Sequence, residues 1–353
     1  MKAKKVQING RSIGVDYPPY IVAEISANHN GNLQRALDII SMAKEMGADA
    51  IKLQTYTAES LTIDSDRPDF KIKGGLWDGY TLYELYDWAK TPYSWHKTMF
   101  DHAAKLGITC FSTPFDESAV DFLEDLNVPA YKIASFEAVD LNLIKYVAQT
   151  KKPIIISTGM ANLLEIEEAV ETAKENGCED LILLHCISGY PSPVGQSNLL
   201  TIPDLSRRFK IITGLSDHTL GTAVSVASVA LGASLIEKHV TMSRDDKGAD
   251  SEFSLEPNEL KSLCSDTRDA WKSLGVAGYE RKPVEQNSMR FRRSLYAVKD
   301  IEIGEQFTKE NIRRIRPGFG LSPKYFDKVI GRSASVSIKK GQPINWSLMD
   351  NDT

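Results

Sequence analysis

Eight short apolar runs, each ending in polar residues, constrain the fold of this 353-residue chain more than any other feature. The runs are rich in Val, Ile and Leu, and amphipathic stretches separate them. Such runs are typical of buried parallel strands, because a strand that is covered on both faces has no polar face. They lie at Ile21–Ser26, Ala50–Gln54, Thr109–Thr113, Ala130–Ser135, Pro153–Thr158, Leu181–Ser188, Ile211–His218 and Ser234–His239. Eight such units predict a (β/α)8 TIM barrel, an α/β fold whose active site lies at the C-terminal ends of the strands.

The stretches between the runs predict the connecting helices. Gly47 follows Leu33–Met46 as a helix C-terminal signal, and Asn162 and Gly177 frame Leu164–Asn176 in the same way. The other predicted helices are Trp95–Leu106, Ser118–Leu126, Leu141–Thr150, Leu200–Arg208, Thr222–Leu231 and Pro257–Leu274.

The chain is longer than the roughly 250 residues that one barrel requires, so a second domain is expected. We expect an N-terminal hairpin at residues 1–18, turning at Asn9-Gly10 and able to close the barrel bottom, then the barrel at 19–275. A polar linker at 276–290 precedes a small β-rich domain at 291–353. Its short strands are predicted at Ser294–Val298, Phe307-Thr308, Ile312–Arg316, Ala334–Ile338 and Pro343–Trp346.

One connection, residues 55–92, is unusually long, and long βα loops on barrels are usually functional. Its aromatic residues allow two interpretations. Tyr83, Leu85 and Tyr86 can form the apolar face of a helix. Leu76 and Trp77 follow a glycine pair, and we expect them to face the substrate.

Composition and charge exclude several classes of protein. The net charge is −5, so the chain as a whole does not resemble a nucleic-acid-binding protein. No apolar run approaches the roughly 18 residues of a membrane span, and the N-terminus does not resemble a signal peptide. Four cysteines without CxxC spacing predict reduced, mostly structural thiols and a cytoplasmic location.

The charge is unevenly distributed. Residues 281–350 hold 15 Lys and Arg against 7 Asp and Glu. This excess of basic residues allows two interpretations. It can form an ordinary solvated face, or it can form a surface that covers an anionic substrate in a neighbouring subunit.

Two histidines are the first candidate for chemistry. His218 and His239 end the last two runs, so they would lie at the same height on adjacent strands. Two imidazoles and a nearby carboxylate can hold a divalent metal and leave positions open, and Glu24 and Asp217 are the carboxylate candidates. A lone histidine at a strand end is usually not a ligand, and His185 is interpreted as a buried histidine with its hydrogen bonds satisfied.

Hydroxyls and lysines form the second candidate group, contributed by six consecutive strands. They are Lys52, Thr113, Lys132, Ser135, Ser157, Ser188 and Ser216. Any one serine at a strand end is usually a local cap, but so many donors at one end suit a phosphate or carboxylate. Because the two lysines would otherwise repel each other and the metal, we infer an anionic substrate.

A third group could hold a polyol: Gln54, Glu137, Tyr190 and Asp250. The loop around Asp250 can also be an ordinary solvated turn. Carboxylates near a metal could perform general acid–base work.

These motifs resemble the sialic acid synthase family. The barrel segments that carry the resemblance are Ala23–His29, Ile51–Thr55, Phe111–Phe115, Tyr131–Ser135, Ser157–Met160, Gly214–His218 and Glu237–His239. In the tail, Arg293–Tyr296 and Arg316–Gly318 are similar to the antifreeze-like (SAF) domain of that family. Within the family, Lys73–Gly79 and Thr81–Tyr86 are most similar to pseudaminic acid synthases.

The resemblance implies condensation of phosphoenolpyruvate with an N-acetylated amino sugar, giving a nine-carbon 2-keto acid and phosphate. It implies that His218 and His239 bind manganese, magnesium or cobalt, that the hydroxyl and lysine group binds phosphoenolpyruvate, and that the polyol group binds the sugar. Many family members have Asn where this chain has Ser188. In a homodimer, Arg316 would be lent by one SAF domain to the partner's site.

In the implied reaction, C3 of phosphoenolpyruvate attacks the aldehyde of the open-chain sugar, water adds to the cationic C2, and C–O cleavage releases phosphate. Glu24 and Glu137 could stabilise the cationic centre or move protons. Three alternatives remain: a metal-dependent aldolase, a non-enzymatic sugar-binding protein, and Schiff-base chemistry at Lys132. Among the synthases, legionaminic and N-acetylneuraminic acid precursors remain alternative substrates.

Overall fold

The computed structural model of the chain describes residues 5–350. Within the chain, Met1–Gly275 and Val276–Thr353 form two compact units.

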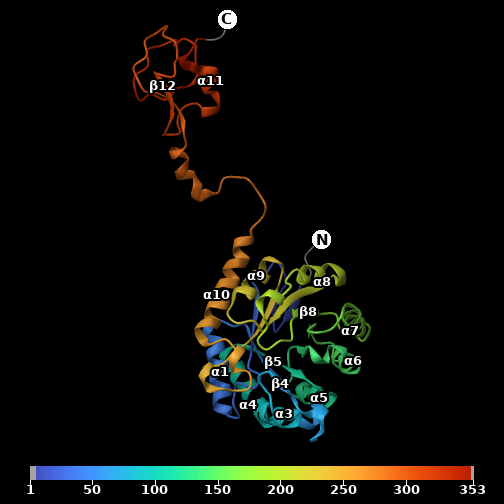
Figure 1. Ribbon diagram of the computed structural model, residues 1–353. Coiled ribbons are helices and arrows are strands. Elements are labelled where there is room, and N and C mark those ends of the chain that lie inside the picture. The colour runs from blue at the N-terminus through green and yellow to red at the C-terminus, as the bar shows by residue number, and fades with distance from the viewer. Residues whose placement is uncertain (1–4, 351–353) are drawn as a thin grey trace. The chain divides into compact units, whose positions relative to one another are not determined.

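The first unit contains the predicted barrel. Its strands are β3 (Tyr20–Glu24), β4 (Ala50–Thr55), β5 (Thr109–Pro114), β6 (Tyr131–Ile133), β7 (Ile154–Ser157), β8 (Leu181–Cys186), β9 (Ile212–Asp217) and β10 (Leu235–His239). All eight pair in parallel, and β10 pairs with β3 to close the barrel. Figure 1 shows β4, β5 and β8 among the surrounding helices. The eight predicted strands are therefore confirmed. Their sequences are continuously apolar because helices or the barrel interior cover both faces of a parallel sheet.

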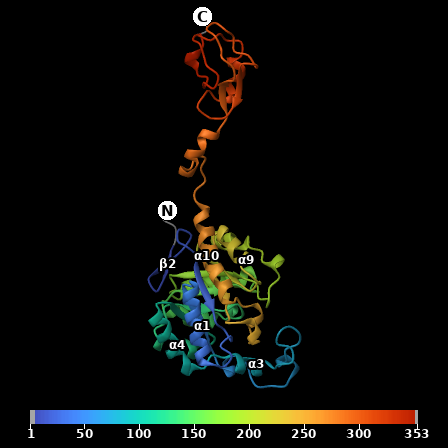
Figure 2. The same cartoon turned by 90° about the vertical axis from the view of Figure 1, so that its left-hand side faces the viewer.

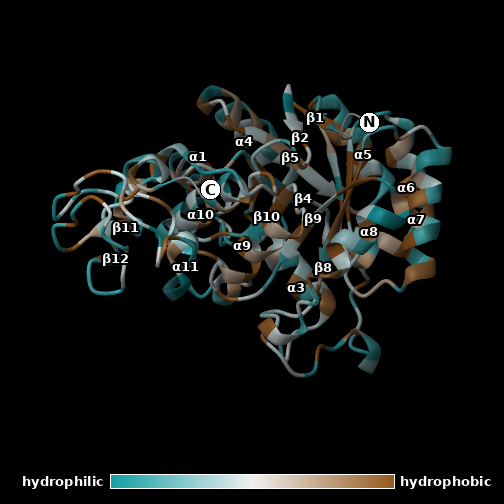
Figure 3. Ribbon diagram, turned by 90° about the horizontal axis from the view of Figure 1, so that it is seen from above, coloured by the Kyte–Doolittle hydropathy of each residue, from teal (hydrophilic) through white to brown (hydrophobic). Residues whose placement is uncertain are grey.

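The connecting helices surround the strands (Figure 3). They are α1 (Leu33–Met46), α4 (Tyr93–Leu106), α5 (Glu117–Asp125), α6 (Leu141–Gln149), α7 (Leu163–Glu175), α8 (Thr201–Phe209), α9 (Ala223–Ala230) and α10 (Pro257–Leu274). Each predicted helix is present within two residues at either end. Asn32 caps α1 through its side chain, and Gly47 ends it in the left-handed conformation with φ 98°.

Shorter elements lie in the loops of this unit. They are α2 (Ala58–Leu61), η1 (Pro68–Phe70), α3 (Leu82–Ala89), η2 (Phe136–Val139), η3 (Val194–Gln196), η4 (Arg244–Asp246) and η5 (Ser251–Phe253). The long 55–92 connection contains α2, η1 and α3. In Figure 2, the loop of this connection next to α3 projects from the barrel. On α3 the expected apolar face is reduced to Leu85, which is buried, while Tyr83 and Tyr86 are only half-buried.

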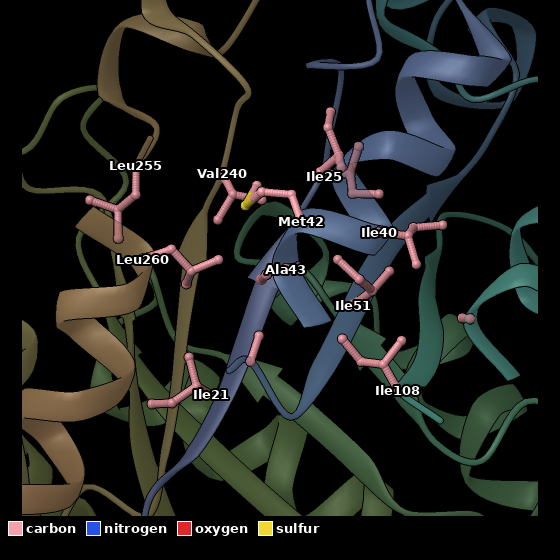
Figure 4. Packing of buried hydrophobic residues seen from close by; sticks show 14 of the residues in the cluster. Ile21, Ile25, Ile40, Met42, Ala43, Ile51, Ile108, Val240, Leu255 and Leu260 are labelled. Carbon is pink, nitrogen blue, oxygen red and sulfur yellow. The ribbon is translucent and has the colours of Figure 1, made fainter. Parts of the chain in front are cut away.

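Apolar side chains between the strands and α1, α4 and α10 form the largest part of the core. Figure 4 shows Ile21 and Ile51 of the sheet packed with Ile40 of α1 and Leu260 of α10. All four are fully buried. Burial of each such side chain stabilises the folded state by about 1.5–3 kcal/mol. The packed layer therefore fixes the positions of the strands relative to the helices.

The N-terminal hairpin closes the end of the barrel opposite the active-site loops. β1 (Val6–Ile8) and β2 (Arg11–Ile13) pair in antiparallel fashion, and Asn9 and Gly10 have positive φ angles of 47° and 79°. Val6, Ile8 and Ile13 pack in one cluster with residues from the strand beginnings, such as Tyr20 and Ala130. Figure 2 shows β2 and α3 at opposite ends of the barrel.

The second unit has its own core, in which Leu295, Phe307, Ile312 and Ile338 are fully buried. Its elements are η6 (Pro283–Phe291), β11 (Ser294–Ala297), β12 (Ile312–Ile315), η7 (Pro323–Tyr325), α11 (Phe326–Val329) and η8 (Trp346–Leu348). Only β11 and β12 form a regular ladder within its described residues.

One expectation about this unit is wrong, that all five predicted segments form regular strands. The segments predicted as strands at Phe307-Thr308, Ala334–Ile338 and Pro343–Trp346 make only isolated bridges there or nearby, such as Ile301 with Ile338 and Tyr296 with Pro343. Turns interrupt the pairing after one residue, and tertiary packing overrides the local strand preference. The segment predicted as a polar linker holds most of η6, because Pro283 starts a helical turn and Glu285 accepts a hydrogen bond from the Lys282 backbone N–H.

No helix within residues 5–350 is long and apolar enough to span a membrane.

Candidate active site

The strand register brings the predicted polar residues together at one end of the barrel. Glu24 at the end of β3 lies opposite His239 on one side and Lys52 on the other. Side chains alternate along a strand, so Lys52 and Gln54 of β4 share the inner side, while Ile51 and Leu53 face the helices. At this end of the barrel, the polar side chains of β4 therefore face the interior, and its apolar side chains face the helices.

Lys52 is held by three oxygen-bearing side chains. Its Nζ lies 2.5 Å from Glu24 Oε2 and donates to Thr113 Oγ1 at 3.2 Å. Glu237 Oε1 is 3.7 Å from the same Nζ. Although burial opposes the charge, Glu237 and Glu24 raise the pKa of Lys52, so the ammonium form persists.

Glu237 is a site residue that sequence reasoning missed. Its Oε1 lies 3.6 Å from Lys132 Nζ and accepts from Ser216 Oγ at 3.3 Å. Despite burial, Lys132 and Lys52 lower the pKa of Glu237, which is therefore ionised. The ionised Glu237 between the two lysines reduces their repulsion, so this repulsion does not by itself require a bound anion. In the sequence, Glu237 stands two residues before His239. Alternation along β10 therefore puts the two side chains on the same side of the strand, and this was the available signal.

Several donors nevertheless remain free to bind an anion. The hydroxyl oxygens of Ser157 and Ser188 are buried and have no hydrogen-bond partner among residues 5–350. Lys132 has no carboxylate closer than 3.6 Å, and burial lowers its pKa. Buried donors without partners are costly, so their presence indicates a bound group that satisfies them.

Gly159 allows the serines to approach each other closely. A Cβ on Gly159 would lie 2.3 Å from Ser135 Cβ and 2.8 Å from Ser188 Oγ, and φ is +47°. Only glycine fits this position without displacing the hydroxyls.

Cys186 also belongs to the site, although the sequence suggested only a structural thiol. It is fully buried, accepts from Ser135 Oγ at 3.3 Å, and its Sγ lies 3.8 Å from His218 Nδ1. Its position at the end of β8, among residues already predicted for the site, was the available signal.

The two predicted metal-binding histidines are neighbours. Their ring centroids are 5.4 Å apart, and both residues are buried. His218 Nδ1 lies 3.0 Å from the carbonyl oxygen of Ile187, which fixes the orientation of the ring. His239 Nδ1 is buried without a hydrogen-bond partner, and burial lowers the pKa of this imidazole well below its usual range.

A neutral imidazole with an unpartnered nitrogen, as at His239, fits a divalent metal of the manganese, magnesium or cobalt class. For His218, burial opposes the charge, but the hydrogen bond with Cys186 raises the pKa. Within residues 5–350, however, no group of three or more His, Cys, Asp or Glu side chains is arranged to hold a metal. The protein thus offers two ligands, and water or substrate would have to supply the rest.

Asp217 does not serve as the expected carboxylate. It pairs with Lys238 Nζ at 2.8 Å and accepts from Ser225 Oγ at 2.6 Å. Alternation directs Asp217 and Lys238 to the helix side of the sheet, away from His218 and His239. Despite burial, Lys238 lowers the pKa of Asp217, so the carboxylate is ionised. The resulting ion pair joins β9 to β10 on the side of the sheet that faces the helices. His185 is satisfied as expected, by the Ser197 carbonyl oxygen at 2.7 Å.

Two carboxyl groups are poised to exchange protons near neutral pH. Burial raises the pKa of Glu24 to about 7, with Lys52 opposing and Glu237 reinforcing the shift. Burial also raises the pKa of Glu137, on η2, to about 7, and its Oε2 is buried without a hydrogen bond. Groups that titrate near the working pH are suited to general acid–base catalysis.

Aromatic side chains form the opposite wall. The Tyr190 ring centroid is 4.5 Å from that of His218 and 5.2 Å from that of Phe253, which was not predicted. Phe253 also lies 4.9 Å from the His239 ring. Asp250 Oδ2 is 3.9 Å from His239 Nδ1, which places this predicted sugar contact beside the histidines.

The long connection reaches this wall through Trp77. Its ring centroid is 5.8 Å from that of Tyr190, and its Nε1 donates to the Ala249 carbonyl oxygen at 2.9 Å. Gln54 is half-buried on the inner side of β4. Arg316 belongs to the second unit, where it is exposed, directly before Pro317.

Comparison with known proteins identifies matches along most of the chain. A model described as "NeuB family" matches residues 39–279, and the SAF domain model matches residues 292–348. The pseudaminic acid synthase of Campylobacter jejuni is 46% identical over 333 residues, which cover 94% of this chain and 97% of that protein. The pseudaminic acid synthase of Helicobacter pylori is 43% identical, with 93% of this chain and 97% of that protein covered.

More distant similarities extend beyond these enzymes. The N,N'-diacetyllegionaminic acid synthase of Campylobacter jejuni is 38% identical, with 92% of this chain and 98% of that protein covered. The crystal structure of N-acetylneuraminic acid synthetase from Leptospira borgpetersenii superposes with a TM-score of 0.73 at 32% identity, covering 82% of this chain and 96% of that one.

Proposed function

This chain belongs to the NeuB family, and from that premise we propose that it condenses phosphoenolpyruvate with an acetamido sugar to give a nonulosonic acid and phosphate. The acceptor we propose is a 2,4-diacetamido-2,4,6-trideoxyhexose of the altrose type, which makes the product pseudaminic acid. The greater identity to pseudaminic acid synthases than to a legionaminic acid synthase supports this acceptor. Legionaminic or N-acetylneuraminic acid synthesis is the second candidate.

One observation carries the proposal: within residues 5–350, buried hydroxyls without partners lie at the same barrel end as a pair of adjacent imidazoles. The hydroxyls of Ser157 and Ser188, with Lys132, can bind the phosphate and carboxylate of phosphoenolpyruvate. Lys52, Thr113, Ser135 and Ser216 complete this anion-binding group. Charge neutralisation is effective here because Lys52 and Lys132 are buried, and charges interact more strongly away from bulk water.

The sugar would lie on the aromatic side, between Tyr190 and Asp250, with Gln54 and Glu137 as further polar contacts. Its open-chain aldehyde must reach C3 of phosphoenolpyruvate for the new C–C bond to form. As the C3 electrons move to the aldehyde carbon, C2 becomes cationic. We propose that the ionised Glu237 carboxylate, which lies between the two lysines assigned to phosphoenolpyruvate, stabilises this charge.

Water then adds to C2, and the resulting tetrahedral species loses phosphate by C–O cleavage. Glu24 and Glu137 are the residues suited to accept the proton of this water and to protonate the new alkoxide, because the pKa of each is about 7. His218 and His239 would hold the divalent metal, which when bound acts as a Lewis acid on the aldehyde oxygen.

We further propose that residues 276–290 act as the linker of a homodimer in which the SAF domain of one subunit supplies Arg316 to the partner's site. The basic excess of this domain would then neutralise the anionic substrate. Four free, buried cysteines agree with a reducing compartment, and we propose that the reaction occurs in the cytoplasm.

The test is a phosphate-release assay with phosphoenolpyruvate and a panel of amino sugars, in the presence of Mn2+, Mg2+ or Co2+. We expect phosphate release that requires both substrates, with the highest kcat/KM for the 2,4-diacetamido-2,4,6-trideoxyhexose. Condensation without phosphate release would instead identify a metal-dependent aldolase. Trapping with borohydride should leave Lys132 unmodified, because no Schiff base is required.

A further inference from the structure

A cavity of about 410 Å³ lies outside the barrel end, between the 55–92 connection and the loop after β10. Trp77, Tyr80 and Trp88 line it from the first segment, and Lys247, Ser251 and Glu252 from the second. Its volume is in the range of small-molecule sites. None of the groups assigned above to phosphoenolpyruvate or the metal lines it.

Trp77 connects this cavity with the active site. It lines the cavity and also contacts Tyr190, whose ring lies against His218. Its indole N–H donates to the carbonyl of Ala249, directly before Asp250. Gly248 allows this loop to lie close to Asn30, since a Cβ there would come within 2.2 Å of Asn30 Oδ1. A ligand bound between Tyr190 and Asp250 would thus extend along Trp77 into the cavity.

The cavity presents a flat aromatic surface. The rings of Tyr80 and Trp88 are nearly parallel, with an interplanar angle of 10° and centroids 5.8 Å apart. Both residues are 41% exposed. Exposed stacked rings offer an apolar face that methyl groups can cover.

Two oppositely charged side chains complete the lining. Neither Lys247 nor Glu252 makes a side-chain hydrogen bond or ion pair within residues 5–350, whereas Arg244 in the same wall is held by Glu259. Lys247 can donate to a carbonyl oxygen, and Glu252 can accept from an N–H. An acetamido group carries a methyl, a carbonyl and an N–H, which match the three features of the cavity.

We propose that this cavity is a distal acceptor subsite that binds the second acetamido group of the sugar, the one remote from the reacting aldehyde. The methyl packs on Tyr80 and Trp88, and the amide is held by Lys247 and Glu252. This inference rests on the proposed function. In this proposal, side chains of the 55–92 connection and of the loop after β10, rather than side chains of the barrel strands, determine which sugar is accepted.

The test compares Trp88→Ala and Lys247→Ala with Tyr83→Ala, a control on the same helix, α3, but outside the cavity. Each variant is assayed with a doubly acetylated 2,4-diacetamido sugar and with a singly acetylated 2-acetamido sugar. We expect both cavity variants to raise KM for the doubly acetylated sugar about tenfold, with less than about twofold change for the singly acetylated sugar and for phosphoenolpyruvate. The Tyr83→Ala variant should match the wild type.

Binding can also be measured without turnover. Trp77 and Trp88 line the cavity, so the doubly acetylated sugar should change the tryptophan fluorescence of the metal-free full-length protein, and Lys247→Ala should weaken that titration. Circular dichroism establishes that each variant is folded. Phosphate release with unchanged KM and unchanged sugar titration in both cavity variants would refute the subsite alone. Absence of phosphate release by the wild type with every sugar would refute the proposed function instead.

Discussion

Three glutamates at one barrel end show how the surroundings of a residue decide its chemistry. Burial raises the pKa of Glu24 and of Glu137 to about 7. Glu237 is buried like Glu24, but two lysines keep its pKa low. All three have the same side chain, so the sequence could nominate glutamates but could not separate the stabilising carboxylate from those that exchange protons.

Replacement of Glu137 by Gln should change how stability depends on pH. The folded-state pKa of about 7 exceeds the ordinary glutamate value of 4.5. The stability that this group contributes is therefore fully present below the unfolded pKa and is lost as pH rises through about 7. The glutamine side chain cannot ionise, so the free energy of unfolding of the variant relative to the wild type should increase by about 1–2 kcal/mol between pH 5 and pH 8.

Urea unfolding at the two pH values measures this difference. Titrations elsewhere in the chain are shared by both proteins and cancel. A difference that stays constant with pH would contradict a raised pKa for Glu137.

Replacement of His239 by Ala should abolish metal-dependent turnover, lowering kcat/KM by at least about a hundredfold, because the metal would lose one of its two protein ligands. Equilibrium dialysis with Mn2+ should show weakened binding in the same variant. His102→Ala is the matched control, since His102 contacts Ser41 and lies outside the site. Wild-type rates in the His239 variant in the presence of a chelator would rule out the metal assignment.

At the scale of elements, the strand ends determine where the polar residues meet, and the loops determine how closely they approach. Sequence periodicity located all eight strands. Alternation along each strand accounts for which residues face inward in the structure, and it excludes Asp217, which its place in the sequence had made a candidate. The close packing around Gly159 depends on a turn after β7 meeting residues after β6 and β8. Contacts of this kind join distant segments, and a local pattern does not contain them.

Gly159→Ala should raise the KM for phosphoenolpyruvate by about ten- to a hundredfold, because the new methyl must displace Ser135 and Ser188. Gly107→Ala is the control: φ there is +66°, but the nearest atom is 4.0 Å away. Both variants carry backbone strain, so comparable losses of stability are expected. Steady-state kinetics separates them, and an equal KM in the two variants would contradict the proposed anion site.

At the scale of the whole molecule, the basic SAF unit needs a role that its own fold does not explain. Arg316 is exposed and lies in a unit distinct from the one that holds the barrel. If it completes the partner's site, each active site contains residues from two chains. The resemblance suggested this arrangement, and mixing of subunits can test it.

Mixing Lys132→Ala subunits with Arg316→Ala subunits should restore activity that neither variant has alone. A mixed dimer would contain one intact barrel and one intact Arg316 that serves it. After unfolding and refolding together at equal amounts, about a quarter of wild-type activity is expected from random pairing of two chains. No recovery in the mixture, with dimers present by light scattering, would show that Arg316 acts within its own chain or not at all.

The order of apolar runs and their polar ends was sufficient to determine the barrel, its connecting helices and most of the candidate site, because both follow from periodicity along a single segment. Tertiary structure alone decided that Glu237 lies between the two lysines, that Lys238 pairs with Asp217, and that Trp77 joins the site to an outer cavity. Each of these depends on distances between segments far apart in the chain. Such distances are set by how the whole core packs, and no single stretch of sequence encodes them.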